Sequence, residues 1–232
     1  MPNVRNQKIY HEASKSGIWS VDFKQPHMQI ARAYTPIPFL QPETKTVWRD
    51  RDQLKLRFLI RKEKEGEVSS YLHALDKKAK IELRGPNIEY RIPGNVQTVV
   101  FLAGGTGIAP ALQVASSLFE LREKMKPLHL HILWANRLGE DCVGGGNNAS
   151  YKAEVLGTQR PVIRQSETLK KWYPGRITVE YFVDEEGKYI IDTSLVPLLG
   201  TGSTGGAPGW TQKVVLVAGP DGFVDHFAGP KE

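Results

Sequence analysis

The chain has 232 residues, enough for one large domain or two of ordinary size. Forty per cent of the residues are hydrophobic and 24% are charged, which excludes wholesale disorder and a fibrous chain. The net charge is +6, but basic residues alternate with acids, as in Arg61 to Glu65, so we expect no nucleic-acid partner. The single cysteine, Cys142, excludes a disulfide framework and a four-cysteine metal site, and we expect no metal.

The N-terminal third consists of short apolar segments separated by turn residues. Alternation with a period of two predicts strands at 19–23, 54–60 and 79–84, and we expect one more at Asn6 to Tyr10. Ser69 to Leu75 is expected to form a short helix whose first serine caps its N-terminus. Antiparallel strands with one short helix favour a small barrel. Because few residues precede Arg32, we predict that this barrel is incomplete.

After Pro93-Gly94 the pattern changes to strands that alternate with helices. Continuous apolar runs predict buried parallel strands at 99–103, 128–135, 176–183 and 213–218. A helix with one apolar face is expected at Ile108 to Lys124. We therefore predict two domains, an antiparallel barrel at 1–92 and an α/β domain with a parallel sheet at 93–232.

Three further stretches carry expectations about membranes and loops. Ile92 to Phe119 contains no charge, yet its glycines and Pro110 favour a strand, a turn and a helix over a membrane span. We expect no membrane span in this chain. The glycine-rich stretches 144–148 and 200–209 are expected to be long loops without chemistry.

A glycine turn links the predicted strand at 99–103 to the helix that follows it. The turn contains Gly104, Gly105, Thr106 and Gly107, and such a turn lets a phosphate approach backbone amides at the positive end of a helix. It departs from the dinucleotide fingerprint because Pro110 replaces the third glycine and because Asn136-Arg137, after the next strand, lacks a ribose-binding acid. A turn that serves packing alone remains the alternative.

Three other segments carry side chains or backbone groups that could bind a ligand. Arg32 and Tyr34 alternate on one strand face, where an arginine can hold a pyrophosphate and a tyrosine can cover a ring. Gly66 to Ser70 begins a helix with free amides and hydroxyls, and Gly219-Pro220 leaves room for a flat ring after the last strand. Alternatives remain open for these segments. Arg32 could form a surface ion pair, Tyr34 could belong to the core, and Gly66 to Ser70 could start an ordinary capped helix.

Taken in chain order, these segments resemble the ferredoxin reductase family of flavoproteins, which includes cytochrome b5 reductase. The matching residues are Arg32 to Thr35, Gly66 to Ser69, Gly104 to Pro110, and Gly219-Pro220. The resemblance implies an FAD-binding antiparallel barrel followed by an NAD(P)-binding α/β domain. Segments 17–26, 29–36 and 218–223 look most like a fungal branch containing a mitochondrial flavoprotein that assists haem attachment to cytochrome c.

The resemblance also implies roles for individual residues on the flavin side. Arg32 would hold the FAD pyrophosphate, Tyr34 would pack on the isoalloxazine, and Thr35 would lie near the reactive flavin edge. Tyr34 and Thr35 are thus the candidate catalytic residues. The phosphate-binding helix start would comprise Gly66, Val68, Ser69 and Ser70.

On the nicotinamide side, the resemblance places the glycine turn in the cleft between the domains, with the residues Gly104, Gly105, Thr106, Gly107 and Pro110. Asn136 and Arg137 would lie near the adenosine end of NADH or NADPH, and Gly219-Pro220 would border the nicotinamide. Arg137 is either a partner for a 2′-phosphate or a member of a surface ion pair, so the choice between NADH and NADPH stays open.

The implied function is an NAD(P)H-dependent oxidoreductase that passes hydride to FAD and then single electrons to a haem or haem-protein acceptor, in cytochrome c haem attachment. A non-catalytic, FAD-containing assembly factor for the haem-attachment enzyme is the alternative, because Ala218 replaces the family's usual cysteine. A third interpretation is a domain that binds NAD(P) but no flavin. The resemblance implies a mitochondrial location, although the first 17 residues lack a targeting pattern, and we expect the chain to be a fragment.

Overall fold

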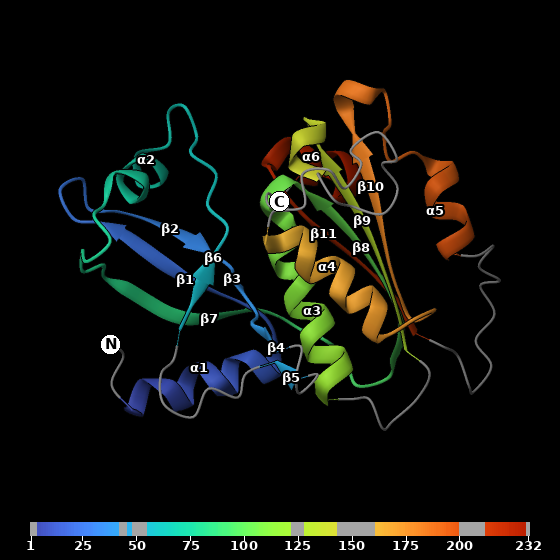
Figure 1. Ribbon diagram of the computed structural model, residues 1–232, viewed down its shortest axis with the longest axis horizontal. Helices are drawn as coiled ribbons and strands as arrows, with labels where there is room; N and C mark the ends of the chain where they lie inside the picture. The colour runs from blue at the N-terminus through green and yellow to red at the C-terminus, as the bar shows by residue number, and fades with distance from the viewer. Residues whose placement is uncertain are drawn as a thin grey trace.

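The computed structural model describes residues 4–41, 46–47, 55–121, 128–142, 161–199 and 212–230. An N-terminal part with antiparallel strands lies beside a C-terminal part with a parallel sheet and flanking helices (Figure 1). The last strand of the N-terminal part ends at Arg91, and the first parallel strand begins at Val96.

The chain begins with helix α1, Val4–Ser16, so the strand expected at Asn6 to Tyr10 is wrong. Tyr10 and Ala13 are three residues apart, which places them on one helix face, and both are buried. The Tyr10 ring packs 5.7 Å from the ring of Trp19. Gly17 then turns the chain into the first strand with φ +137°, and a side chain there would collide with the backbone oxygen of Tyr90.

The antiparallel sheet has the order β2-β1-β7, with strands β1 at Gly17–Gln25, β2 at Ile30–Tyr34 and β7 at Leu83–Arg91. The strand expected at 19–23 is confirmed as part of β1. The strand expected at 79–84 is wrong in its position, because β7 starts at Leu83 and continues through Gly85-Pro86. Residues 79–82 are all exposed, so their alternation has no core to face.

The remaining antiparallel strands are two residues long. β3 at Pro36–Ile37 pairs with β6 at Arg57–Phe58, and β4 at Leu40–Gln41 pairs with β5 at Thr46–Val47. The strand expected at 54–60 is therefore confirmed only at 57–58, and residue 54 lies outside the described residues. The antiparallel sheet is confirmed, but the described strands do not close into a barrel.

Helix α2, Glu67–Ala74, confirms the short helix, but its expected serine cap is wrong. Gly66 occupies the N-cap position, and no side chain caps the helix. The Ser69 hydroxyl lies within the first turn, where it accepts a hydrogen bond from the Glu63 N–H (3.1 Å) and donates one to the Gly66 oxygen (3.0 Å). Val68 is fully buried in the core of the N-terminal part, which fixes α2 on the sheet.

The C-terminal part contains four parallel strands in the order β10-β9-β8-β11. They are β8 at Val96–Gly104, β9 at His129–Asn136, β10 at Ile177–Val183 and β11 at Gln212–Ala218. All four predicted strands are confirmed. The helix expected at Ile108 to Lys124 is confirmed over Ile108–Leu121, and residues 122–124 lie outside the described residues. The glycine-rich stretches at 144–148 and 200–209 lie outside the described residues.

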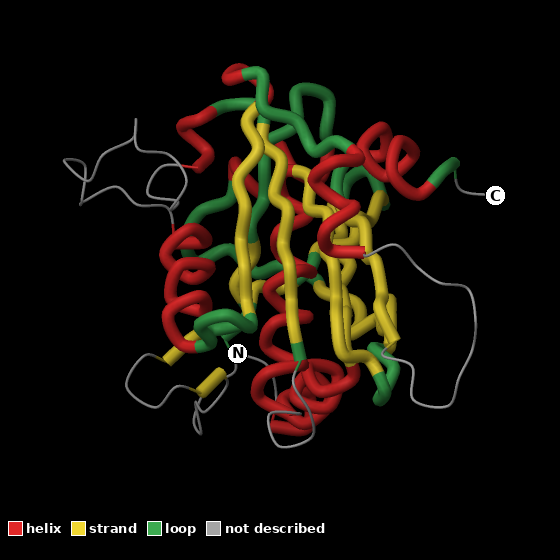
Figure 2. Tube along the Cα trace, turned by 90° about the vertical axis from the view of Figure 1, so that its right-hand side faces the viewer, coloured by secondary structure: helices red, strands yellow, loops and turns green. Residues whose placement is uncertain are grey.

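Helices lie on both sides of the parallel sheet, as Figure 2 shows. Helices α3 at Ile108–Leu121 and α4 at Pro161–Trp172 cover one face, and α5 at Asp192–Leu199 and α6 at Asp221–Ala228 cover the other. Along β8, Val99 and Phe101 face α3 while Val100 and Leu102 belong to the cluster with α5 and α6. A strand covered on both faces must be apolar throughout, which explains the continuous run in the sequence.

The uncharged stretch from Ile92 to Phe119 forms β8, a short 3₁₀ turn at Gly105–Gly107 and most of α3. The expectation of a strand, a turn and a helix is confirmed. Among the described residues, no helix is both long enough and apolar enough to cross a membrane.

Buried polar side chains join the two parts of the molecule. Gln113 of α3 accepts a hydrogen bond from the Trp19 N–H and donates one to the Pro36 oxygen, both at 2.9 Å. Gln165 of α4 donates to the Pro38 oxygen at 2.8 Å and accepts a 2.6 Å hydrogen bond from Arg57. Burial of the guanidinium lowers the pKa of Arg57. Two helices of the C-terminal part therefore anchor β1 and the segment around β3.

Titration of His131, on strand β9 of the parallel sheet, should affect the stability of the protein. Burial is the main cause that lowers the pKa of His131 on β9, and the neighbouring His129 and Lys213 act in the same direction. The unfolded chain, with an ordinary histidine pKa of about 6.5, therefore binds a proton that the folded protein resists. We expect the free energy of unfolding to fall as the pH drops below about 6.5.

In the variant His131→Gln this pH dependence should be shallower, because glutamine does not titrate. Urea unfolding at several pH values measures the slope. Equal slopes in the parent and in His131→Gln would contradict the prediction.

Candidate functional site

The order of the parallel strands places a crevice between the ends of β8 and β11. The chain passes from β8 to β9 and then to β10 in one direction, and β11 lies on the other side of β8. Ligands of open parallel sheets bind outside the carboxyl ends of the strands at such a switch point. A cavity of about 810 Å³ lies there, and its lining includes Gly104, Gly105, Thr106, Asn136, Arg137, Gly219 and Pro220.

Several glycines in this region are required by close packing. A Cβ atom on Gly104 would lie 2.8 Å from the Phe223 ring, and one on Gly219 would lie 3.0 Å from the Gly104 Cα atom. A Cβ atom on Gly107 would collide with the backbone oxygen of Ala218. Gly107 and Pro110 are buried and do not line the cavity. The packing alternative therefore accounts for Gly104, Gly107 and Gly219.

Gly105 differs from the other glycines of the turn. Its backbone is in the left-handed region, with φ +53°, and the nearest atom to an added Cβ would be the Arg61 Nη1 at 3.8 Å. Its carbonyl oxygen accepts a hydrogen bond from the Trp134 indole Nε1 at 2.8 Å. Close packing does not explain a glycine here, whereas the backbone conformation does.

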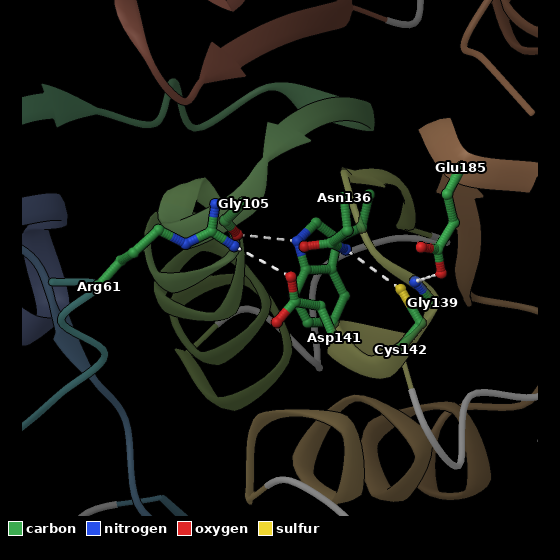
Figure 3. A network of polar contacts seen from close by, with 8 residues as sticks. Arg61, Gly105, Asn136, Gly139, Asp141, Cys142 and Glu185 are labelled. Atoms are coloured by element: carbon green, nitrogen blue, oxygen red, sulfur yellow. Dashed lines mark hydrogen bonds and ion pairs between the residues drawn. The ribbon is translucent and has the colours of Figure 1, made fainter. Parts of the chain in front are cut away.

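Polar contacts connect the glycine turn with the ends of the neighbouring strands (Figure 3). Arg61 donates a 3.1 Å hydrogen bond to Asp141 and so joins the N-terminal part to the segment after β9. Asn136 is buried, and its amide group donates to the sulfur of Cys142 at 3.3 Å. The side chain of Asn136 thus has a structural role at the edge of the cavity, and Cys142 is fully buried.

Arg137 is exposed and lines the 810 Å³ cavity. Its backbone oxygen accepts a hydrogen bond from the Glu185 N–H at 3.1 Å. Within the described residues, the side chain of Arg137 has no ion pair, so the surface ion pair considered from the sequence is not formed. Its guanidinium is available to a ligand in the cavity.

A second cavity of about 280 Å³ lies between the two parts of the molecule. Ile37, Phe58 and Ile60 line it from the N-terminal part, and Thr106 and Trp134 line it from the C-terminal part. Arg61 and Gly105 line both cavities. The segment after β6 therefore faces the glycine turn directly.

The candidate flavin-side residues lie on β2 and just after it. Arg32 is exposed, and its Nη1 donates a 3.1 Å hydrogen bond to the Ala31 oxygen. Tyr34 is half-buried with its ring 5.3 Å from the ring of Phe23, and Thr35 is also half-buried. Burial is the main cause that raises the pKa of Tyr34; the charge of Arg32 opposes this effect and the charge of Glu63 adds to it.

Glu63 connects the two groups of candidate residues. It is close enough to Tyr34 to affect its pKa, and it lines the 810 Å³ cavity together with Gly105. The linings of the two cavities, as far as the structure describes them, do not include Arg32, Tyr34 or Thr35. The structure therefore places the glycine turn at the larger cavity, whereas the link from this cavity to Tyr34 runs through Glu63.

The start of α2 is only partly free to bind a ligand. The Ser70 N–H donates to the Gly66 oxygen at 2.8 Å, and the Val68 side chain belongs to the core. A Cβ atom on Gly66 would lie 2.5 Å from the Ser69 hydroxyl oxygen. Of these four candidates, Val68, Ser69 and Ser70 offer a ligand less than the sequence suggested, because the Ser69 hydroxyl is also buried and hydrogen-bonded.

Several residues that line the larger cavity were not predicted from the sequence. Arg61 and Glu63 belong to a run of alternating charges that carries no distinctive pattern. Asp184 directly follows β10, and the rule that sites lie at the carboxyl ends of parallel strands would have found it. Among the described residues, no group of three or more His, Cys, Asp or Glu side chains could hold a metal ion.

Comparison with known proteins agrees with this geometry. Residues 101–228 match the family model "Oxidoreductase NAD-binding domain". The chain is 40% identical over 90 residues to the cytochrome c mitochondrial import factor CYC2 of Saccharomyces cerevisiae, which covers 37% of this chain and 25% of that protein. It is 37% identical over 109 residues to an uncharacterised FAD-binding protein of Schizosaccharomyces pombe, covering 47% of this chain and 36% of that protein.

A more distant similarity extends over more of the chain. NADH-cytochrome b5 reductase 2 of Kluyveromyces lactis is 25% identical over 179 residues, covering 76% of this chain and 53% of that protein. The chain therefore spans between a quarter and about half of the length of these three relatives.

Among solved structures, the CS-b5R domains of human Ncb5or in the NAD⁺ form superpose with a TM-score of 0.61 at 17% identity, covering 90% of this chain and 54% of that one. This likeness shows a shared fold. Since the family model matches more than half of the chain, the chain belongs to the oxidoreductases with an NAD-binding domain, and its fold is ferredoxin reductase-like.

Proposed function

We propose that the chain is part of an FAD-dependent NAD(P)H oxidoreductase that delivers single electrons to a haem or haem-protein acceptor. The observation that carries this proposal is the 810 Å³ cavity at the switch point of the parallel sheet, which residues from both parts of the molecule line. When bound, the two cofactors would supply hydride transfer from nicotinamide to flavin, followed by the release of electrons one at a time. We divide the chain into an FAD-binding domain at 1–92 and an NAD(P)-binding domain at 93–232.

The larger cavity fits a dinucleotide. Gly105 and Thr106 line it at the positive end of α3, where backbone N–H groups favour a phosphate. Arg137 adds a free positive charge at the end of β9, next to the position that we assign to the adenosine. Gly219 and Pro220 form the wall that we assign to the nicotinamide, and their small size leaves space for a flat ring.

The flavin assignment is supported by the residues on β2 and α2. Arg32 is exposed and has guanidinium N–H groups to offer a pyrophosphate, since only Nη1 has a hydrogen bond, to a neighbouring carbonyl. Tyr34 shares the face of Arg32, and Thr35 follows toward the junction with the parallel sheet. We assign the phosphate contact at α2 to the backbone amides of its first turn, that of Ser69 included, because the Ser69 hydroxyl proton is already donated to the Gly66 oxygen. The FAD-binding relative from Schizosaccharomyces pombe supports the same cofactor.

The biological setting follows from the similarity to the yeast import factor. Because that relative is named for the import of cytochrome c into mitochondria, we propose a mitochondrial role in cytochrome c maturation, with the haem-attachment machinery as the partner. Ala218 at the end of β11 supports a second candidate, a non-catalytic assembly factor that keeps FAD for its structure.

Two observations on the purified protein distinguish these functions. A yellow protein that loses its visible flavin absorbance when mixed with NADH or NADPH without oxygen is a reductase. A yellow protein whose flavin stays oxidised is the assembly factor. A protein that stays colourless after FAD has been supplied would overturn both candidates.

The FAD assignment of Arg32 makes a quantitative prediction. Replacing Arg32 by alanine removes a charge-assisted contact to the pyrophosphate, so FAD affinity should fall by about 2 kcal/mol, or roughly 30-fold. Titration of the apoprotein with FAD, followed by flavin fluorescence, measures the loss. Arg91→Ala, at an exposed position on β7, is the matched control and should bind FAD like the parent. Equal affinity in Arg32→Ala and the parent would remove this assignment.

A further inference from the structure

Trp134 lies beneath the glycine turn, in the last third of β9. Its side chain is buried, with 3% exposure, between neighbouring strands whose paired residues are Ala103 on β8 and Tyr181 on β10. The ring packs 5.8 Å from the ring of Tyr181. One polar atom of this apolar side chain, the indole nitrogen, reaches the turn and donates to the Gly105 oxygen at 2.8 Å.

The Gly105 carbonyl is held from two directions. Besides the hydrogen bond from Trp134, it accepts one from the N–H of Ile108 in the first turn of α3. Two donors on one oxygen fix the direction of that carbonyl. A peptide unit is planar and trans, so the N–H of Thr106 must point opposite to this oxygen.

The orientation of this peptide determines what the turn offers to a ligand. The Thr106 N–H points away from Trp134 and from the body of α3, and the first N–H groups of a helix have no acceptor within the helix. Gly105 and Thr106 both line the 810 Å³ cavity. Gly105 has φ +53°, a backbone conformation that glycine adopts without strain.

We infer that Trp134 is a positioning residue that aims the Thr106 N–H at an anionic group, a phosphate of a dinucleotide in the larger cavity. This inference rests on the proposed function. A buried indole N–H finds an acceptor in any case, so the hydrogen bond alone does not distinguish positioning from core filling. If Trp134 only filled the core, another aromatic ring could replace it without an effect on the ligand.

The variant Trp134→Phe separates these two roles, because it keeps an aromatic ring in the core and removes the N–H donor. ADP-ribose is the probe, since it carries the diphosphate without the nicotinamide. Isothermal titration should show that Trp134→Phe binds ADP-ribose roughly fivefold to tenfold more weakly, as expected for one lost hydrogen bond. Trp172→Phe, at a half-buried tryptophan of α4, is the control and should bind like the parent.

A second measurement keeps the test independent of stability. In ¹⁵N-labelled parent protein, ADP-ribose should shift the amide resonance of Thr106, and this shift should shrink in Trp134→Phe. Unchanged affinity in Trp134→Phe, or a Thr106 amide that ADP-ribose does not move while Arg137 responds, would overturn the positioning role and leave the proposed function intact. A parent protein that binds no ADP-ribose would overturn both.

Discussion

Replacing Gly107 by alanine should destabilise the protein by about 3 kcal/mol, at the upper end of the usual cost of overpacking. The added methyl group would collide with the backbone oxygen of Ala218 and lie 3.0 Å from the Gly219 nitrogen. Both are backbone atoms at the end of β11, so neither can rotate away as a side chain would. Relief requires β11 to move from the turn after β8, and this movement would also distort the cavity between these strands.

Urea unfolding followed by tryptophan fluorescence measures this loss, with ADP-ribose binding as a second readout. Gly94→Ala is the matched control, because a Cβ atom there would have no neighbour within 4 Å. The control should unfold at the same urea concentration as the parent. An unchanged midpoint for Gly107→Ala would show that the ends of β8 and β11 are not held as closely as described.

Replacing Gln113 by leucine should also cost about 3 kcal/mol, because it leaves two buried backbone groups without partners. The side chain is 4% exposed, and the Trp19 N–H and the Pro36 oxygen each bond to it at 2.9 Å. Leucine has a similar volume, so the loss would reflect unpaired polar groups rather than a cavity.

Thermal unfolding of Gln113→Leu measures this effect, with Gln97→Leu as the control. Gln97 is a half-buried glutamine on β8, and within the described residues its side chain forms no hydrogen bond. The control should differ little from the parent. If Gln113→Leu were as stable as Gln97→Leu, the contact between α3 and the N-terminal part would not contribute to folding.

The parallel half of the fold could be predicted from the sequence because its signals are local. The apolar run at 99–103 and the glycines after it identify a buried strand and a turn without any knowledge of distant residues. The N-terminal half depends on contacts that are far apart in the chain. Leu83, where β7 starts, pairs with Phe23, and the alternation of residues 79–82 gives no sign of this start. Gly85-Pro86, a pair typical of turns, lies inside a strand.

In the candidate site, too, some residues have a local signal in the sequence and others depend on contacts with distant segments. The glycines at the ends of β8 and β11 could be located from sequence, because sites of parallel sheets lie at the carboxyl ends of the strands. That Gly104, Gly107 and Gly219 serve close packing could not be predicted. Arg61 and Trp134 could not be located, because each reaches the turn at Gly105 from a distant segment: Trp134 donates to the Gly105 oxygen, and Arg61 lines the same two cavities as Gly105. No spacing rule relates an indole nitrogen on one strand to a carbonyl beyond the end of its neighbour.

Gln113 and Gln165 come from different helices and together hold three points of the N-terminal part: the Trp19 amide and the Pro36 and Pro38 carbonyls. A body fixed at three points cannot swing about a single axis without breaking one of them. The two parts of the molecule that line the 810 Å³ cavity therefore keep their spacing in the absence of a ligand. Entry of a dinucleotide then requires little reorganisation of the two parts.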